Sequence, residues 1–304
     1  MRKKAWLFLG CLILFSAAGV LLRALELRTA LDPSTMLMDM TPASILLLVL
    51  SAAALALMGL LARKLDTEAL PSRYNLCFGG VGSLVVSALS LALVFLGALL
   101  CLRERDSDWS MRLFLSLLAL TGFLAGAAWL ALGLDGWRKK KADSFLSAVL
   151  PVIFCGLFLI VFYKKYAQLP ALLYSLYPFL GLCAALGGLH LIAGFTVGRE
   201  RVRPRTALFL CGAGAYLCAV SLVGVPLNAY RLFFAALILE LAAYGVYLLL
   251  PHPPEPEEEA EKEKEKETEA SPEGGDSGAE EGEDAPEAEG SSDAGSNDAE
   301  KNAE

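Results

Sequence analysis

One acidic side chain lies near the middle of a long apolar stretch, and it is the residue of this chain best placed to do chemistry. Glu240 interrupts the otherwise uncharged run 232–250. An ionised carboxylate is costly inside a bilayer and normally faces other helices or a water-filled cavity. There it can relay a proton or cation, contact a substrate, or serve as a neutral, hydrogen-bonded structural residue. Tyr244 follows one helical turn later, where its hydroxyl group can bond the carboxyl group. We predict that both side chains line a transport path inside a helix bundle.

A single histidine occupies another apolar stretch. His190 shares a helix face with Cys183, Gly187 and Gly194. Small residues allow helices to approach closely, so this spacing predicts that the face points into the bundle. His190 then either joins Glu240 on the transport path or bonds a neighbouring backbone or hydroxyl group as a structural residue. The spacing leaves open whether the two side chains meet.

Sequence motifs of soluble catalysis are missing from the chain. It contains no GxxxxGK[ST], HExxH or GxSxG motif, and its seven cysteines form no CxxC pair. Two histidines cannot build a multi-histidine metal site. This pattern favours a protein that is not an enzyme and that uses no metal or cofactor. An integral membrane enzyme acting on lipid is a weaker alternative, because few ionisable groups fall at membrane depth.

Eight stretches rich in Leu and Ala must position these residues. Each has about 18 to 27 residues, and a helix of about 20 residues spans the hydrocarbon core. The sequence therefore predicts an all-α, polytopic transmembrane helical bundle of about eight spans. The first span has some features of a signal peptide, but its length favours a retained anchor. The predicted spans are 5–22, 44–62, 76–102, 112–134, 144–163, 176–198, 206–225 and 229–250.

Charge divides the chain into two parts. Residues 1–250 carry a net charge of +10, and residues 251–304 carry −17. We interpret 1–250 as the transmembrane domain and 251–304 as an acidic tail, because low hydrophobicity and high charge predict disorder. The tail is either a solvated cytoplasmic segment or an acidic arm that docks on the basic loops.

The orientation follows from the positive charges of the short loops. With the N-terminus inside, the inner segments hold 14 Lys and Arg residues and the outer segments hold 8. Positive charge is enriched on the cytoplasmic side of membrane proteins. We therefore predict a multi-pass protein of the plasma membrane or the bacterial inner membrane, with both termini in the cytoplasm.

Two basic clusters lie on the predicted inner face. Because they adjoin a bilayer, anionic lipid headgroups are the expected partners, with the acidic tail as a competitor and no role for nucleic acid. The candidate residues are Arg138, Lys139, Lys140, Lys141, Arg199, Arg201, Arg203 and Arg205.

Small residues recur at helical spacing in several spans. Such Gly, Ala and Ser seams usually pack helices against each other, and they also offer contacts to other membrane proteins. The seams are Gly79/Ser83/Ser87, Gly122/Gly126, Ala184/Gly188 and Gly194/Gly198.

These features predict two competing functions. The favoured one is transport or permeation of a small solute or ion, with Glu240 and His190 on the path. The alternative is a non-catalytic scaffold or regulatory subunit of a membrane complex, which would use the seams and the tail. A water-filled cavity that reaches Glu240 favours transport, whereas a solid bundle favours the subunit.

Overall fold

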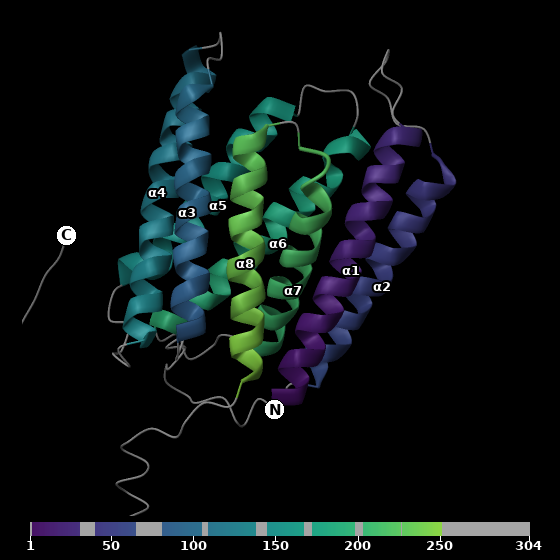
Figure 1. The fold of residues 1–304 in the computed structure, drawn as a ribbon, viewed down its shortest axis with the longest axis horizontal. Helices are drawn as coiled ribbons and strands as arrows, with labels where there is room; N and C mark the ends of the chain where they lie inside the picture. The colour runs from purple at the N-terminus through teal and green to yellow at the C-terminus, as the bar shows by residue number, and fades with distance from the viewer. Residues whose placement is uncertain are drawn as a thin grey trace, which may run out of the picture. The chain divides into compact units, whose positions relative to one another are not determined.

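The helices predicted from composition are present. The computed structural model describes residues 2–30, 40–64, 81–104, 109–137, 145–166, 172–197, 203–225 and 227–250, and within these ranges it has eight helices and no strand (Figure 1). The all-α helical bundle is therefore confirmed. In chain order the helices are α1 (Arg2–Thr29), α2 (Pro42–Arg63), α3 (Val81–Arg103), α4 (Trp109–Trp137), α5 (Phe145–Tyr166), α6 (Leu172–Val197), α7 (Pro204–Ser221) and α8 (Asn228–Leu249).

Seven of these helices are long and apolar enough to cross a membrane, so the chain is a multi-pass membrane protein. The exception among the eight predicted spans is α7, which has 18 residues and is buried along nearly its whole length. Helices α1, α2, α6 and α8 surround α7. Since its side chains meet protein instead of lipid, α7 can hold small residues where a lipid-facing helix needs large apolar ones.

The first helix is longer than predicted. The sequence places the end of the first span at residue 22 and assigns Arg23 to an outer loop, but α1 continues to Thr29. This assignment of Arg23 is wrong, because the guanidinium group pairs with Glu26 on the same helix and both side chains are buried. A charged side chain that has a partner three residues away does not end a membrane helix.

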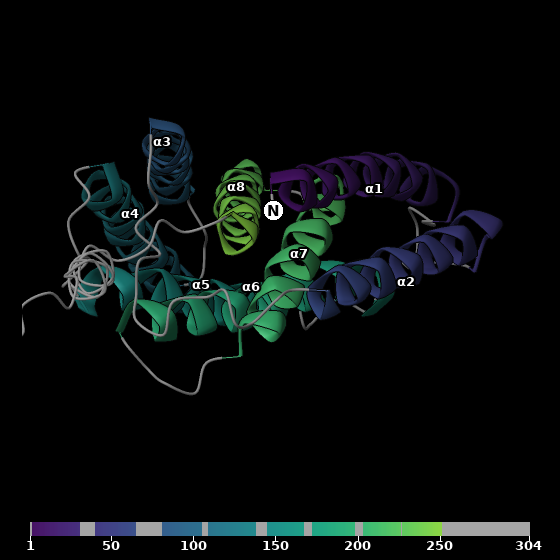
Figure 2. The ribbon, with the colours of Figure 1, turned by 90° about the horizontal axis from the view of Figure 1, so that it is seen from below.

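Six helices form a ring. Helix α3 packs on α4, α4 on α5, α5 on α6, α6 on α7, α7 on α8, and α8 closes the ring on α3. Figure 2 shows this ring in end view, with α1 and α2 lying outside it against α7. The interior of the ring is therefore lined by helices that are distant in sequence, and α8 carries Glu240 into it.

Contacts between the helices show which helix ends lie together. The Lys4 ammonium group at the start of α1 donates to the carbonyl oxygen of Lys64 after α2, at 3.3 Å. Near the end of α8, a Cβ atom at Gly245 would lie 2.6 Å from the Phe8 ring. The first residues of α1, the end of α2 and the end of α8 thus share one end of the bundle. We call it the near end, and the opposite one the far end.

The near end is predicted to face the cytoplasm. Epitope tags inserted at 31–39, 105–108 or 167–171, which join helices at the far end, should therefore be labelled in intact cells. Tags at 138–141 or after residue 254 should be labelled only after permeabilisation, because the inner segments carry the excess of positive charge. External labelling of a tag after residue 254 would contradict the predicted orientation.

Candidate functional site

Glu240 is turned into the ring. It lies near the middle of α8 and is 2% exposed, and Leu237, Leu241 and Tyr244 are buried on the same side of the helix. Helical spacing explains the grouping, since residues three and four apart share a face. The carboxyl group therefore meets protein and not lipid, in keeping with the expense of a carboxylate in hydrocarbon.

Three serines of α3 face α8. Ser83, Ser87 and Ser90 are 2%, 7% and 0% exposed, and their three- and four-residue spacing forms one polar stripe on α3. Ser90 and Ser87 are the side chains within reach of the Glu240 carboxyl group. Even so, Oε1 of Glu240 and Oγ of Ser90 have no hydrogen-bond partner among the described residues. The carboxyl group thus lies beside hydroxyl groups without being fully bonded by them.

Helix α4 adds an indole to this site. Trp129 is fully buried, and its side chain approaches the hydroxyl group of Tyr244. Nε1 of Trp129 also lacks a hydrogen-bond partner within the described part of the chain. One turn further along α4, Gly133 allows close contact, since a Cβ atom there would lie 3.0 Å from Oγ of Ser87. The glycine thereby holds α4 close enough to α3 for both to reach α8.

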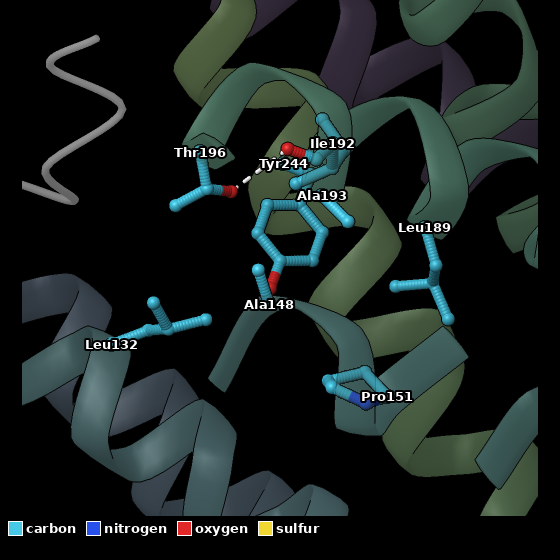
Figure 3. Close-up of a pocket in the computed structure, with 8 residues that line it drawn as sticks. All are labelled: Leu132, Ala148, Pro151, Leu189, Ile192, Ala193, Thr196 and Tyr244. Carbon is cyan, nitrogen blue, oxygen red and sulfur yellow. Dashed lines mark hydrogen bonds between the residues drawn. The ribbon is translucent and has the colours of Figure 1, made fainter. Parts of the chain in front are cut away.

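A small pocket adjoins Tyr244 in the near half of the ring. Figure 3 shows its lining, which comes from α4, α5, α6 and α8 and is apolar except for the Tyr244 and Thr196 hydroxyl groups. The Thr196 hydroxyl group donates to the carbonyl oxygen of Ile192 at 2.9 Å. The pocket has room for about one water molecule. Its lining consists of Leu132, Ala148, Pro151, Leu189, Ile192, Ala193, Thr196 and Tyr244.

Aromatic rings fill the far half of the ring of helices. Phe158 of α5 lies at the centre, with its ring centroid 5.3 Å from that of Tyr230, 5.5 Å from Phe233 and 5.1 Å from Phe234. Successive turns of α5 and the first turns of α8 supply these rings. Phe154 and Phe158 are stacked, and the contacts of Phe158 with the α8 rings are edge-to-face or tilted. We call the following residues the aromatic plug: Phe154, Phe158, Phe162, Tyr230, Phe233 and Phe234, all no more than 2% exposed.

Trp129 of α4 lies near residues in both the near and the far half of the ring of helices. Its ring packs edge-on against Phe154 of the plug, with centroids 6.4 Å apart, while its side chain also approaches Tyr244. We call Glu240, Ser87, Ser90, Trp129 and Tyr244 the polar site. The site lies between the near-end pocket and the plug. This arrangement places a group that can bind a cation or a proton between a small pocket and a closely packed aromatic cluster.

His190 does not join the polar site. It is exposed on the outer surface of α6, as is Cys183, so the predicted inward orientation of this face is wrong. The rotation of α6 is set by Gly181 and Gly188, where a Cβ atom would lie 3.1 Å and 3.4 Å from backbone nitrogens of α7. His190 follows Gly188 by two residues, which is roughly 200° around a helix. Once the glycines face α7, the histidine must face outward.

The basic candidates are only partly described. Arg203 and Arg205 are exposed at the start of α7. The remaining candidates, Arg138, Lys139, Lys140, Lys141, Arg199 and Arg201, lie outside the described residues, as does the tail 251–304. Binding of anionic lipid or of the tail at these positions stays a prediction.

Three glycines of the predicted seams lie between helices of the bundle. At Gly122 a Cβ atom would lie 3.1 Å from the Phe154 ring, and at Gly126 it would lie 2.9 Å from Leu91. Gly188 packs against α7 in the same way. These three positions therefore serve contacts within the chain. Gly79 and Gly198 lie outside the described residues.

A second buried polar cluster lies outside the ring at the far end. Nη1 of Arg23 is 2.5 Å from Oε2 of Glu26, and the guanidinium group lies 5.1 Å from the centre of the Tyr177 ring of α6. Nearby, the hydroxyl groups of Ser51 and Tyr216 hydrogen-bond at 2.9 Å across α2 and α7. None of the sequence predictions names this cluster, although the three-residue spacing of opposite charges at the end of an apolar run is a signal for it.

No family model, no curated protein and no solved structure matches this chain. The function is therefore inferred from the geometry of the polar site.

Proposed function

We propose that this multi-pass membrane protein transports a small solute or ion, and that its cargo binds at Glu240. One observation carries the proposal. Glu240 is buried in the middle of a helix ring beside the hydroxyl groups of Ser87 and Ser90, and its Oε1 atom has no hydrogen-bond partner among the described residues. Buried polar groups are nearly always bonded, so we infer that a bound proton, ion or water molecule completes the bonding of this atom.

The two halves of the ring support a gated path. A bundle that moves cargo must open its site to one side while the other side is closed. The near-end pocket reaches Tyr244, one helical turn from Glu240, whereas the aromatic plug fills the ring on the far side. Pro151 lines the pocket and lies inside α5, about one turn before the plug residue Phe154. A proline removes a helix hydrogen bond and so provides a place where α5 can bend.

A change of Glu240 tests this function. The purified protein is reconstituted into vesicles, and fluxes of H⁺, Na⁺ and K⁺ are followed under an imposed membrane potential, with empty vesicles as the blank. Glu240→Gln keeps the shape and removes the titratable group, so it should abolish coupled flux while changing stability by about 1 kcal/mol or less. Glu240→Leu removes the hydrogen bonding as well and should cost about 1 kcal/mol.

Glu104→Gln is the matched control, because Glu104 follows the end of α3 and lies away from the polar site. It should leave flux at the level of the unmodified protein. Coupled flux that persists in Glu240→Gln would rule out a working role for this carboxyl group and leave it structural.

The competing function, a scaffold or regulatory subunit, has two observations in its favour. The described pocket has room for about one water molecule and its lining does not include Glu240, so the helices are packed around this carboxyl group, as the subunit alternative predicts. His190 is exposed on an outer face of α6 within an apolar span, and a polar side chain in that position is commonly satisfied by a neighbouring membrane helix. A protein of this kind would show no flux in vesicles with or without Glu240. The flux measurement therefore separates the two functions.

A further inference from the structure

We infer that the species bound at Glu240 is a proton. The inference rests on the proposed function for the site and narrows it to one cargo or coupling ion. Its starting point is the charge balance around the carboxyl group. Glu240 is 2% exposed, and the side chains that act on it most directly are the neutral hydroxyl groups of Ser90 and Ser87.

The neighbours on every helix packed against α8 are also uncharged. Helix α7 contributes Cys211, α4 contributes Trp129, and α8 itself contributes Tyr244 and Tyr247. Helix α1 presents the apolar ring of Phe8 at Gly245, and α6 approaches Leu241 through Gly188. Within the described residues, therefore, no Lys, Arg or His acts on Glu240. An ionised carboxylate there would be a buried charge without a counter-charge, which proteins avoid by taking up a positive species.

The size of the site restricts that species. The adjoining pocket has room for about one water molecule. An organic cation does not fit in such a space. Two classes of positive species remain, a proton on the carboxyl group itself and a bare metal cation such as Na⁺.

The hydrogen-bonding side chains of the polar site favour a proton over a metal cation. The indole N–H of Trp129, which approaches the Tyr244 hydroxyl group, can only donate a hydrogen bond, so it suits the oxygen of that group or of a water molecule and offers no ligand to a metal cation. The hydroxyl groups of Ser87, Ser90 and Tyr244 can both donate and accept. They can therefore bond the carboxyl group in its neutral form and in its ionised form, as a site that takes up and releases a proton must do.

We place Tyr244 on the route of the proton, because it lines the pocket and lies one helical turn from Glu240. A hydronium ion from the near end protonates a water molecule in the pocket, and that water passes one proton to the Tyr244 hydroxyl oxygen. Tyr244 gives its own proton to Oε1 of Glu240. One O–H bond forms at each acceptor as one breaks at each donor, so Tyr244 ends unchanged and Glu240 becomes neutral. Release to the far side requires the aromatic plug to open.

Infrared spectroscopy tests proton binding apart from transport. The full chain in lipid nanodiscs is titrated from acidic to alkaline buffer. The quantity followed is the carbonyl stretching band of the protonated Glu240 carboxyl group, obtained by comparing the spectra of the unmodified protein with those of the Glu240 variants. We expect this band to disappear as the pH rises, to be absent in Glu240→Gln and to return in Glu240→Asp. Glu104→Gln should retain it. Proton flux in vesicles carrying a pH-sensitive dye should fall about a hundredfold or more in Glu240→Gln, the usual scale for losing a positioned proton-transfer group.

Two results would overturn the proton assignment. A spectrum with no titrating band that depends on Glu240 shows that this carboxyl group does not exchange a proton. Loss of the band on adding Na⁺ at constant pH, together with uptake of radioactive Na⁺ that needs Glu240, assigns the site to sodium. A band that titrates as expected in a protein without ion flux supports proton binding and instead removes the proposed transport function.

Discussion

Replacing Arg23 by Ala should lower the free energy of unfolding by about 3–5 kcal/mol, the range for removing one partner of a buried ion pair. The Arg23 and Glu26 side chains are 1% and 8% exposed. Without the guanidinium group, the Glu26 carboxylate would remain buried near Tyr177 of α6 with its charge unpaired. Equilibrium unfolding of the purified protein in detergent micelles measures the change.

Two companion variants separate the charge from the size of the side chain. Arg23→Met keeps much of the length and should still destabilise, because Glu26 stays unpaired. Arg23→Met combined with Glu26→Leu removes both charges and should restore most of the stability, since apolar residues of similar size often replace a buried pair without loss. If Arg23→Met alone unfolds like the unmodified protein, the pair contributes nothing and the buried charge is accommodated in another way.

The helices themselves could be predicted because each depends on local composition. A run of about 20 apolar residues in lipid must satisfy its backbone hydrogen bonds internally, which leaves the helix as its structure. Helix formation in lipid does not depend on the partners of a helix. The end of α1 does depend on a partner, because Arg23 pairs with Glu26 three residues later, and a prediction that treats Arg23 as a solvent-facing residue therefore ends the helix too early.

The rotation of each helix depends on its partners and was harder to predict. The sequence offers two small-residue faces on α6, one with Gly181 and Gly188 and the other with Gly187 and Gly194. Lipid is as apolar as Leu, so hydrophobicity does not choose between them. The choice is made by close backbone contact with α7, which Gly181 and Gly188 permit. This contact depends on both helices, so the sequence of α6 alone does not reveal it. The prediction that His190 faces inward is wrong for this reason.

The polar site was half predictable for a similar reason. Glu240 and Tyr244 are one turn apart on α8, so the spacing alone places them together. Ser90 and Trp129 come from α3 and α4, which meet α8 only when the ring closes. Nothing in the local sequence distinguishes these two residues from other Ser and Trp residues in the spans.

The second large effect is expected at the aromatic plug. Phe158→Ala removes a ring that contacts Phe154, Tyr230, Phe233 and Phe234. We expect a loss of about 3 kcal/mol in stability, at the low end for a buried Phe, because the side chain returns to lipid and not to water on unfolding. We also expect proton flux in vesicles to rise, because the missing ring leaves an opening between the polar site and the far end.

The control for this prediction lies on the same helix. Ile160 follows two residues later and is 55% exposed on the outside of the bundle, so Ile160→Ala should change neither stability nor flux appreciably. Combining Phe158→Ala with Glu240→Gln then tests the order of the path. If protons pass from Glu240 through the plug, the second change should abolish the added flux. Flux that stays high in the combined variant would show that the opening bypasses Glu240, and unchanged flux in Phe158→Ala would show that the plug is packing and not a barrier.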